Sequence, residues 1–228
     1  MKQMALDIGL VSVPSLSSFV DVGNEAALAH VQQCAEQPQH ATLPTFLWGE
    51  GGCGKTHLLM AVAESLREQG QRVGWIDAQR SYPGEYNDDW DAVLLDDCHL
   101  YTPAQQAAAF NWFINAQNPA HGPARWVLAT ADRPPADLPL REDLRTRLGW
   151  GHVFQLHAPG EAVCRAVLHR AAEERGLSLG EDVVGFMLNR FSRDLSSLMQ
   201  LLGHLDGYAL RTQRGITIPL IKSMLENE

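Results

Sequence analysis

Residues 49–56 read GEGGCGKT, a stretch that fits the pattern G-x-x-x-x-G-K-[ST] in full. Glycines in this pattern let backbone N–H groups curve around phosphate oxygens, while the lysine neutralises the β and γ phosphates and the hydroxyl ligates Mg²⁺. We therefore expect Lys55 to contact phosphate and Thr56 to be a metal ligand. The predicted nucleotide-binding residues here are Gly49, Gly51, Gly52, Cys53, Gly54, Lys55, Thr56 and His57.

The residues on either side suit such a loop. TFLW at 45–48 is an apolar run typical of a buried strand, and HLLMAVAESLREQG at 57–70 has helical periodicity that ends at Gly70. A helix that starts at the loop adds its positive dipole to the phosphate site. The alternative is a glycine-rich turn that merely joins strand to helix, and the strand, loop and helix order favours the phosphate loop.

A second acidic element lies in DAVLLDDCHL at 91–100. Residues 92–95 suit a buried parallel strand, and Asp96 and Asp97 come where that strand ends. We expect Asp96 to be a ligand of Mg²⁺ and Asp97 to lie near the attacking water. The alternative is an acidic loop after a strand, which the preceding GKT sequence disfavours.

The rest of the chain continues an α/β pattern and then changes. Strands are predicted over 72–78, 125–130 and 152–156, with a helix over 103–117 opened by Thr102 and Pro103. Strands that alternate with helices predict a five-stranded parallel sheet flanked by helices, with nucleotide at the carboxyl ends of the strands. After Pro159 only helical periods follow, which predicts a small all-helical domain of three or four helices.

Composition limits the class of protein. The 228 residues are 45% hydrophobic and 20% charged, as in ordinary globular chains, and neither a signal peptide nor an apolar run of roughly 20 residues is present. We expect a cytoplasmic protein without a membrane partner. The formal charge of -9 argues against broad binding to nucleic acid, and no sequence-specific DNA binding is expected. The four cysteines are scattered, and His30 with Cys34 could share a helix face, but two ligands do not make a metal site.

The order of these motifs resembles an AAA+ ATPase of the DnaA branch. After the P-loop come DDCHLY at 96–101, FNWFINA at 110–116, TADRPP at 130–135 and RLGWG at 147–151. The resemblance runs from SFVDVG at 18–23 to ITIPLIKSML at 216–225, and no segment like the DNA-binding domain of DnaA follows it. It implies a P-loop AAA+ module with ADP or ATP and Mg²⁺ as cofactors, followed by a helical lid domain.

Several roles follow from that resemblance. Asp132 falls at the sensor position for the γ-phosphate, although Thr130 is close enough to compete for the role. Arg193, at the opening of a late helix, matches the second sensor and would bind nucleotide from the lid. Asp97 stands where the wider family commonly has a longer glutamate, which implies weak or absent intrinsic hydrolysis.

The resemblance also implies an arginine finger, the cation that one subunit extends into the nucleotide site of another. Arg147 in TRLGW matches it, with Arg141 and Arg145 as the candidates if the register is shifted. Nucleotide-dependent contacts of this kind leave self-association open.

The N-terminal sequence MKQMALDIGL adds a partner. Gln3, Met4, Leu6 and Ile8 resemble peptides that bind the replication sliding clamp, in which a glutamine precedes apolar residues. An extended peptide fits because the amide can bond at a pocket rim while the apolar side chains fill a groove. The pattern alone equally suits a loose end or an edge strand.

Together these features predict a clamp-binding peptide over 1–10, an AAA+ domain over 11–158 and a lid over 159–228. Such a chain resembles the regulatory members of the DnaA branch, which inactivate DnaA together with the clamp by promoting hydrolysis of ATP bound to DnaA. The alternative is a DnaC-like helicase loader that spends its own ATP on single-stranded DNA. That class favours a basic, aromatic surface, which the charge of -9 opposes.

Overall fold

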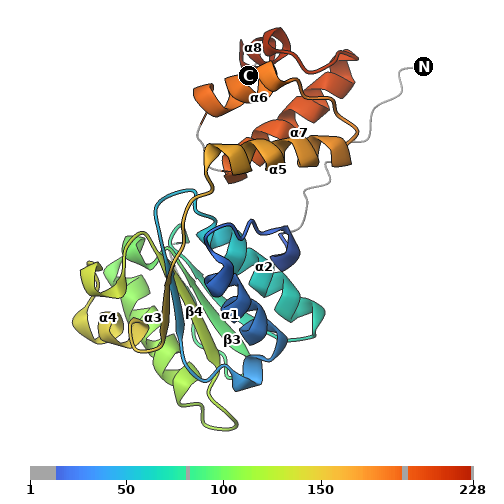
Figure 1. Ribbon diagram of the computed structural model, residues 1–228. Helices are drawn as coiled ribbons and strands as arrows, with labels where there is room; N and C mark the ends of the chain where they lie inside the picture. The colour runs from blue at the N-terminus through green and yellow to red at the C-terminus, as the bar shows by residue number, and fades with distance from the viewer. Residues whose placement is uncertain (1–13, 81–82, 192–194, 227–228) are drawn as a thin grey trace. The chain divides into compact units, whose positions relative to one another are not determined.

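The computed structural model describes residues 14–80, 83–191 and 195–226, and its contacts separate an α/β unit that ends at Ala158 from a helical unit that begins at Pro159 (Figure 1). The α/β unit holds one parallel sheet with the strand order β2-β3-β4-β1-β5. Its strands are β1 (Thr45–Trp48), β2 (Val73–Asp77), β3 (Ala92–Asp96), β4 (Trp126–Ala131) and β5 (His152–Gln155). The predicted five-stranded parallel sheet is confirmed.

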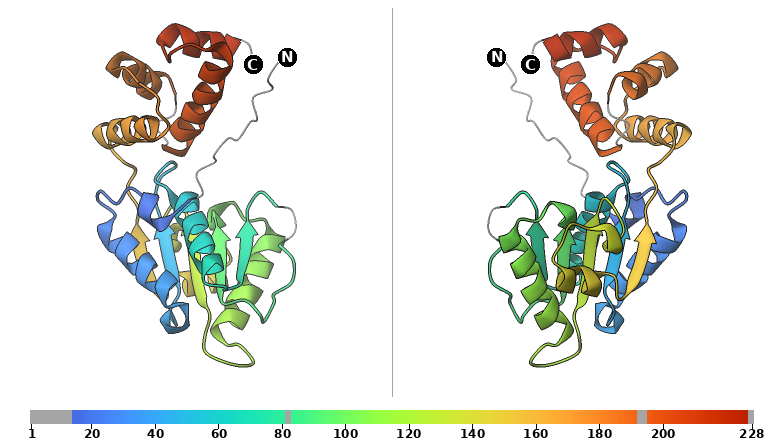
Figure 2. Two further views of the ribbon diagram at one scale, coloured as in Figure 1. Left: turned by 90° about the vertical axis from the view of Figure 1, so that its right-hand side faces the viewer. Right: turned by 90° about the vertical axis from the view of Figure 1, so that its left-hand side faces the viewer.

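Helices cover both faces of the sheet (Figures 1 and 2). Helices α1 (Glu25–Glu36) and α2 (Lys55–Glu68) pack on one face, and α3 (Pro103–Gln117) and α4 (Glu142–Leu148) pack on the other. Successive strand residues point to opposite faces, so Leu47 joins the core under α1 and α2 while Phe46 joins the core under α3 and α4. Because both faces are covered, every residue of β3 is buried.

Helix α3 begins as the sequence predicts, with a capping box at its first turn. The Thr102 hydroxyl accepts from the Gln105 N–H, and the Gln105 side-chain oxygen accepts from the Thr102 N–H. Gln105 is also buried, and its Nε2 donates to three carbonyl oxygens in and after β2, those of Asp77, Ala78 and Arg80, at 2.9–3.2 Å. One amide therefore fixes the start of α3 to the chain that follows β2.

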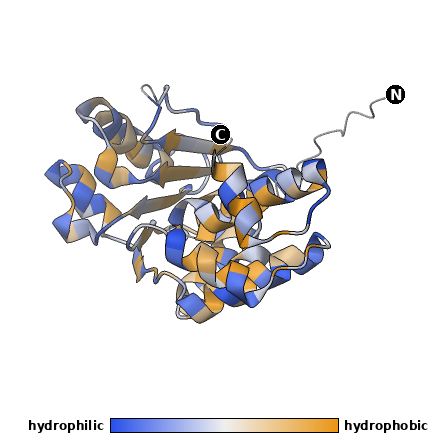
Figure 3. Ribbon diagram, turned by 90° about the horizontal axis from the view of Figure 1, so that it is seen from above, coloured by the Kyte–Doolittle hydropathy of each residue, from blue (hydrophilic) through white to orange (hydrophobic). Residues whose placement is uncertain are grey.

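The helical unit consists, within the described residues, of α5 (Glu161–Glu174), α6 (Glu181–Arg190), α7 (Leu195–Thr212) and α8 (Ile218–Glu226). They share a separate core to which Leu168, Val184, Leu198 and Ile221 contribute. Figure 3 shows hydrophobic residues on the strands of the sheet and in patches along helices that also carry hydrophilic residues. No helix in the described ranges combines the length and the apolar character needed to cross a bilayer.

The amino ends of the strands carry a chain of polar side chains in which His30 is central. Its Nε2 lies 2.9 Å from Thr45 Oγ1, which also accepts from the indole N–H of Trp126 at 3.1 Å. Cys34 Sγ lies 3.5 Å from the same His30 nitrogen, so the two residues do share a face of α1. The His152 ring stands 4.4 Å from the His30 ring, centroid to centroid.

This cluster predicts loss of stability in mild acid. Burial, with a smaller contribution from the charge of His152, lowers the pKa of His30 below its usual value of about 6.5. Between the lowered pKa and about pH 6.5, the unfolded chain therefore binds more protons at His30 than the folded chain does. The stability that neutral His30 contributes is present above about pH 6.5 and is lost as the pH falls from there toward the lowered pKa. Melting temperatures between about pH 7.5 and 5 should fall less steeply in His30→Gln, which cannot titrate; equal slopes would contradict this.

Candidate nucleotide-binding site

The loop between β1 and α2 has a backbone that needs glycine. Gly52 and Gly54 have φ values of 80° and 92°, in the left-handed region that side chains disfavour. A Cβ on Gly54 would stand 2.8 Å from the Phe19 ring, and a Cβ on Gly49 would collide with the carbonyl oxygen of Leu156. Gly51 is exposed, with open space beside its Cα. The predicted loop glycines thus occupy a tight turn directly before α2.

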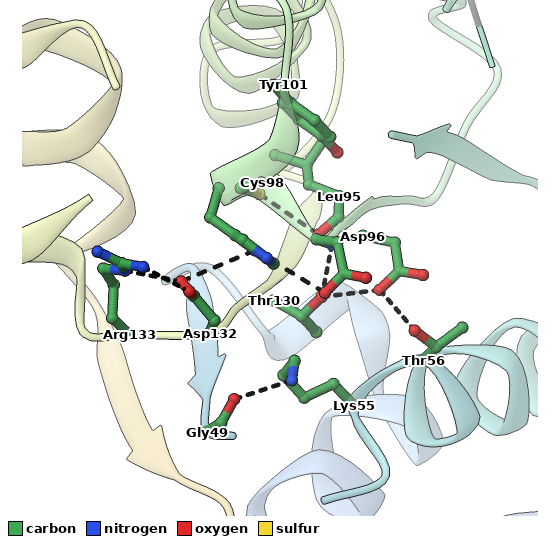
Figure 4. A network of polar contacts seen from close by, with 12 residues as sticks. Gly49, Lys55, Thr56, Leu95, Asp96, Cys98, Tyr101, Thr130, Asp132 and Arg133 are labelled. Carbon is green, nitrogen blue, oxygen red and sulfur yellow. Dashed lines mark hydrogen bonds and ion pairs between the residues drawn. The ribbon is translucent and has the colours of Figure 1, made fainter. Parts of the chain in front are cut away.

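Lys55 is the first residue of α2 and is 8% exposed. Its ammonium donates to the carbonyl oxygen of Gly49 at 2.9 Å (Figure 4) and to that of Glu50 at 3.1 Å, inside the curve of the loop. Cys53 lies in the same curve with its sulfur 3.9 Å from Lys55 Nζ, and burial raises the pKa of this thiol. A buried cation held on backbone carbonyls beside a helix N-terminus fits a phosphate-binding role.

His57, also predicted to bind nucleotide, lies in the first turn of the same helix. Its Nε2 stands 3.5 Å from Ser18 Oγ and its ring lies 6.3 Å from that of Phe19, centroid to centroid. Burial lowers the pKa of His57. The imidazole therefore contacts the segment that precedes α1, and its role toward nucleotide stays a prediction.

Asp96 ends β3, and its carboxylate collects two hydroxyl donors. Thr56 Oγ1 donates to Asp96 Oδ1 at 3.2 Å and Thr130 Oγ1 donates to the same oxygen at 2.8 Å (Figure 4). Burial raises the pKa of Asp96 although both hydrogen bonds oppose the rise. The two predicted metal ligands, Thr56 and Asp96, are thus in contact, and their hydroxyl and carboxylate oxygens are the hard donors that Mg²⁺ prefers.

Asp97 follows in a left-handed backbone conformation, with φ of 47°. Its N–H donates to Thr130 Oγ1 at 2.9 Å, so the hydroxyl of one β4 residue ties the two aspartates together. Thr130 is fully buried and engaged on both sides, which makes it a structural tie between β3 and β4. The conformation of Asp97 sets the direction of the short 3-10 turn that follows, Cys98–Leu100.

Asp132, the predicted sensor, comes directly after β4. Both of its carboxylate oxygens accept from the neighbouring guanidinium: Arg133 Nε donates to Oδ1 at 2.9 Å and Nη2 donates to Oδ2 at 2.7 Å. These bonds hold the pKa of Asp132 below its usual range. The carboxylate is therefore charged and oriented.

Arg147 does not belong to this cluster. It lies on α4, on the other face of the sheet from α2, with its guanidinium carbon 5.4 Å from the centre of the Phe110 ring (Figure 1). Among the described residues its side chain has no ion pair, whereas Arg141 stacks on the same ring and is paired with Asp143 at 2.6 Å. Trp150 beside it is 67% exposed.

Five predicted site residues lie outside the described residues: Arg193, Gln3, Met4, Leu6 and Ile8. Three others that take part in the geometry were missed from the sequence. His99 lies between the carboxylates of Asp97 and Asp132. Arg133 donates hydrogen bonds to Asp132, and the ring of Phe110 lies next to the Arg147 guanidinium. Arg133 directly follows Asp132 and His99 comes two residues after Asp97, and this closeness to acidic motif residues is the one signal that could have found them; nothing in the sequence singles out Phe110.

The fold and this site define a P-loop nucleotide-binding module of the AAA+ class. The family model of the bacterial DnaA ATPase domain matches residues 15–155, and the model described as the lid domain of Hda matches residues 161–225. The chain belongs to the bacterial DnaA ATPase domain family, and its helical unit is a lid of the Hda type. The resemblance to the DnaA branch is confirmed, and the lid model that matches the helical unit is that of Hda.

Individual proteins that are similar to this chain are also DnaA proteins. The chromosomal replication initiator DnaA of Psychromonas ingrahamii is 32% identical over 96% of this chain, which spans about half, 51%, of that protein. Domain III of DnaA from Thermotoga maritima has the same fold, with a TM-score of 0.75 at 22% identity over 95% of this chain and 97% of that one. AMPPCP-bound DnaA from Aquifex aeolicus gives a TM-score of 0.67 at 21% identity, over 85% of this chain and 65% of that one.

Proposed function

We propose that this chain is a regulatory inactivator of the replication initiator DnaA. It binds the sliding clamp through its N-terminal peptide and directs Arg147 at ATP held by DnaA, which promotes hydrolysis there and prevents re-initiation. The observation that carries the proposal is the position of Arg147, an arginine without an ion pair among the described residues, on the face of the sheet opposite α2. From that face it is available to the nucleotide site of another molecule.

The chain's own P-loop would hold ADP or ATP with Mg²⁺. Lys55 and the loop N–H groups would bind the phosphates, Thr56 and Asp96 the metal, and Arg193 would contact nucleotide from the lid. The AMPPCP-bound relative supports the nucleotide class. Mg²⁺ would offset the charge of the phosphates. Because the side chain of Asp97 is shorter than that of glutamate and would hold the attacking water less well, we propose that this site hydrolyses ATP weakly or not at all.

The surface around Arg147 supports a protein partner. A hollow of about 790 Å³ is lined by Arg141, Glu142, Asp143, Thr146, Arg147 and Trp150. Exposed Trp and Arg side chains are the residues that most often anchor protein interfaces. Charges of both signs in this hollow, with a formal charge of -9 on the whole chain, favour a protein surface over a phosphate backbone.

The experiment that tests the function asks whose nucleotide is hydrolysed. DnaA preloaded with labelled ATP is mixed with this protein, the clamp and DNA, and nucleotide on DnaA is followed in a single turnover. We expect conversion to ADP that depends on this chain and on the clamp. No conversion on DnaA, together with hydrolysis of this chain's own ATP on single-stranded DNA, would replace the proposal with the helicase-loader function.

The N-terminal peptide gives a separate prediction. Replacing Gln3 and Leu6 with alanine should abolish clamp binding, because the amide contact and one apolar anchor are both lost, and should leave the melting temperature unchanged. Clamp capture of the parent and the variant, beside thermal unfolding of both, measures the two effects. Capture that survives both substitutions contradicts the peptide, and a large drop in melting temperature would show that these residues pack in the core.

A further inference from the structure

His99 occupies an unusual place in the site. Its Nδ1 lies 3.9 Å from Asp97 Oδ1 and 3.9 Å from Asp132 Oδ1, between the two carboxylates assigned to the attacking water and to the sensor. The side chain is only 16% exposed, and Nδ1 is buried without a hydrogen-bond partner among the described residues. An unpaired buried polar atom in a cluster this ordered calls for a partner.

The backbone fixes this place. Asp97 turns the chain left-handed, and the Leu100 N–H donates back to the Asp97 carbonyl at 2.9 Å, which closes the 3-10 turn. On the far side of that turn, the buried Tyr101 hydroxyl donates to the Ile76 carbonyl at 3.1 Å. The backbone of His99 therefore belongs to a short segment that is fixed at both ends.

The neighbours of Nδ1 decide its protonation. Both nearby atoms are carboxylate oxygens, which accept and never donate when ionised. A bare Nδ1 would direct its lone pair at two negative charges, so the hydrogen belongs on Nδ1. A single N–H that is equidistant from two acceptors can approach only one of them to the 2.7–3.2 Å of a hydrogen bond, because ring rotation toward one carries it away from the other.

The carboxylates of Asp97 and Asp132 differ in the hydrogen bonds that they already accept. Arg133 donates to both oxygens of Asp132, at 2.9 and 2.7 Å. The Asp97 carboxylate accepts no hydrogen bond from any described residue, and is 34% exposed. We infer that His99 is a positioning residue whose Nδ1–H serves Asp97, and that Arg133 keeps Asp132 from competing for it. The inference rests on the proposed role of Asp97 in the nucleotide site.

The test measures the protonation of the two His99 ring nitrogens directly, in the whole chain without DnaA or clamp. Long-range ¹⁵N–¹H correlation spectra show which ring nitrogen carries hydrogen, and comparison with His99→Asn assigns His99 among the nine histidines. We expect the hydrogen on Nδ1. The Nδ1–H signal should shift more in Asp97→Ala than in Asp132→Ala. A dominant Nε2–H form, or the larger shift in Asp132→Ala, overturns the inference.

Two substitutions test the positioning itself. The amide nitrogen of Asn stands the same number of bonds from Cα as Nδ1, and that of Gln the same number as Nε2. In the chain without nucleotide, the ¹³C signal of the Asp97 carboxylate should therefore stay near its parent position in His99→Asn, which keeps a donor at the place of Nδ1, and should move in His99→Gln, which does not. Equal movement in both variants contradicts the inference. The tautomer measurement is independent of DnaA, so it can fail or succeed separately from the proposed function.

Discussion

Replacing Arg147 with alanine is expected to reduce the stimulation of hydrolysis on DnaA by on the order of 10³-fold or more, the contribution of an arginine finger supplied in trans. The guanidinium stabilises charge that develops on phosphate oxygens in the transition state, which a methyl group cannot do. Binding of this chain's own nucleotide and of the clamp should be unchanged, because Lys55 and the N-terminal peptide provide those. Single-turnover hydrolysis of labelled ATP preloaded on DnaA measures the effect.

The structure supplies a matched control for that experiment. Arg141 stacks on the same Phe110 ring but is paired with Asp143, so Arg141→Ala removes an equal charge from beside the same ring, at the opposite end of α4, and should leave most of the stimulation intact. Arg147→Lys should rescue poorly, because an ammonium lacks the planar fork of guanidinium. If Arg147→Ala stimulates as well as the parent, Arg147 is not the finger, and Arg145 or Arg141 becomes the candidate.

Lys55→Ala should weaken binding of ADP and ATP to this chain by roughly tenfold to a hundredfold, the effect of losing a charged hydrogen bond of about 1.5–3 kcal/mol. The phosphates would lose their buried cation, and calorimetric titration with each nucleotide measures the change in affinity. Unchanged affinity in a folded variant contradicts the assignment of the P-loop.

Folding needs its own control at this position. Lys55 also donates to the carbonyl oxygens of Gly49 and Glu50, so alanine leaves both without their donor and removes the buried stem. Lys55→Met keeps most of the stem and loses the charge. If the loss of affinity comes from the charge, both variants should bind equally weakly, and only Lys55→Ala should show an additional loss of melting temperature.

The sheet could be predicted because its strands are short apolar runs next to motifs that fix their direction. The helices α1 and α4, by contrast, could not be predicted from the sequence. Helix α1 buries mainly small residues such as Ala27, Cys34 and Ala35, which give little hydrophobic contrast, and α4 is seven residues long with only Leu144 and Leu148 buried. Both helices owe their stability to packing on the sheet more than to their own sequence.

The site divides in the same way. The P-loop and Asp96 follow from local sequence, because the chemistry requires consecutive residues with fixed roles. The contacts of Thr130, His99 and Phe110 depend on which strands are neighbours and how α4 crosses α3, and separations of 33 and 34 residues along the chain carry no such information. The left-handed backbone of Asp97 was equally invisible, since aspartate at a strand end rarely adopts it.

The hydrogen bonds of Gln105 fix the start of α3 in place. Its first turn is anchored to the chain that follows β2, and Phe110 lies five residues further on, about 7.5 Å along the same helix. The anchor and the ring next to the Arg147 guanidinium therefore belong to one rigid element, so the place of that guanidinium depends on the chain that follows β2.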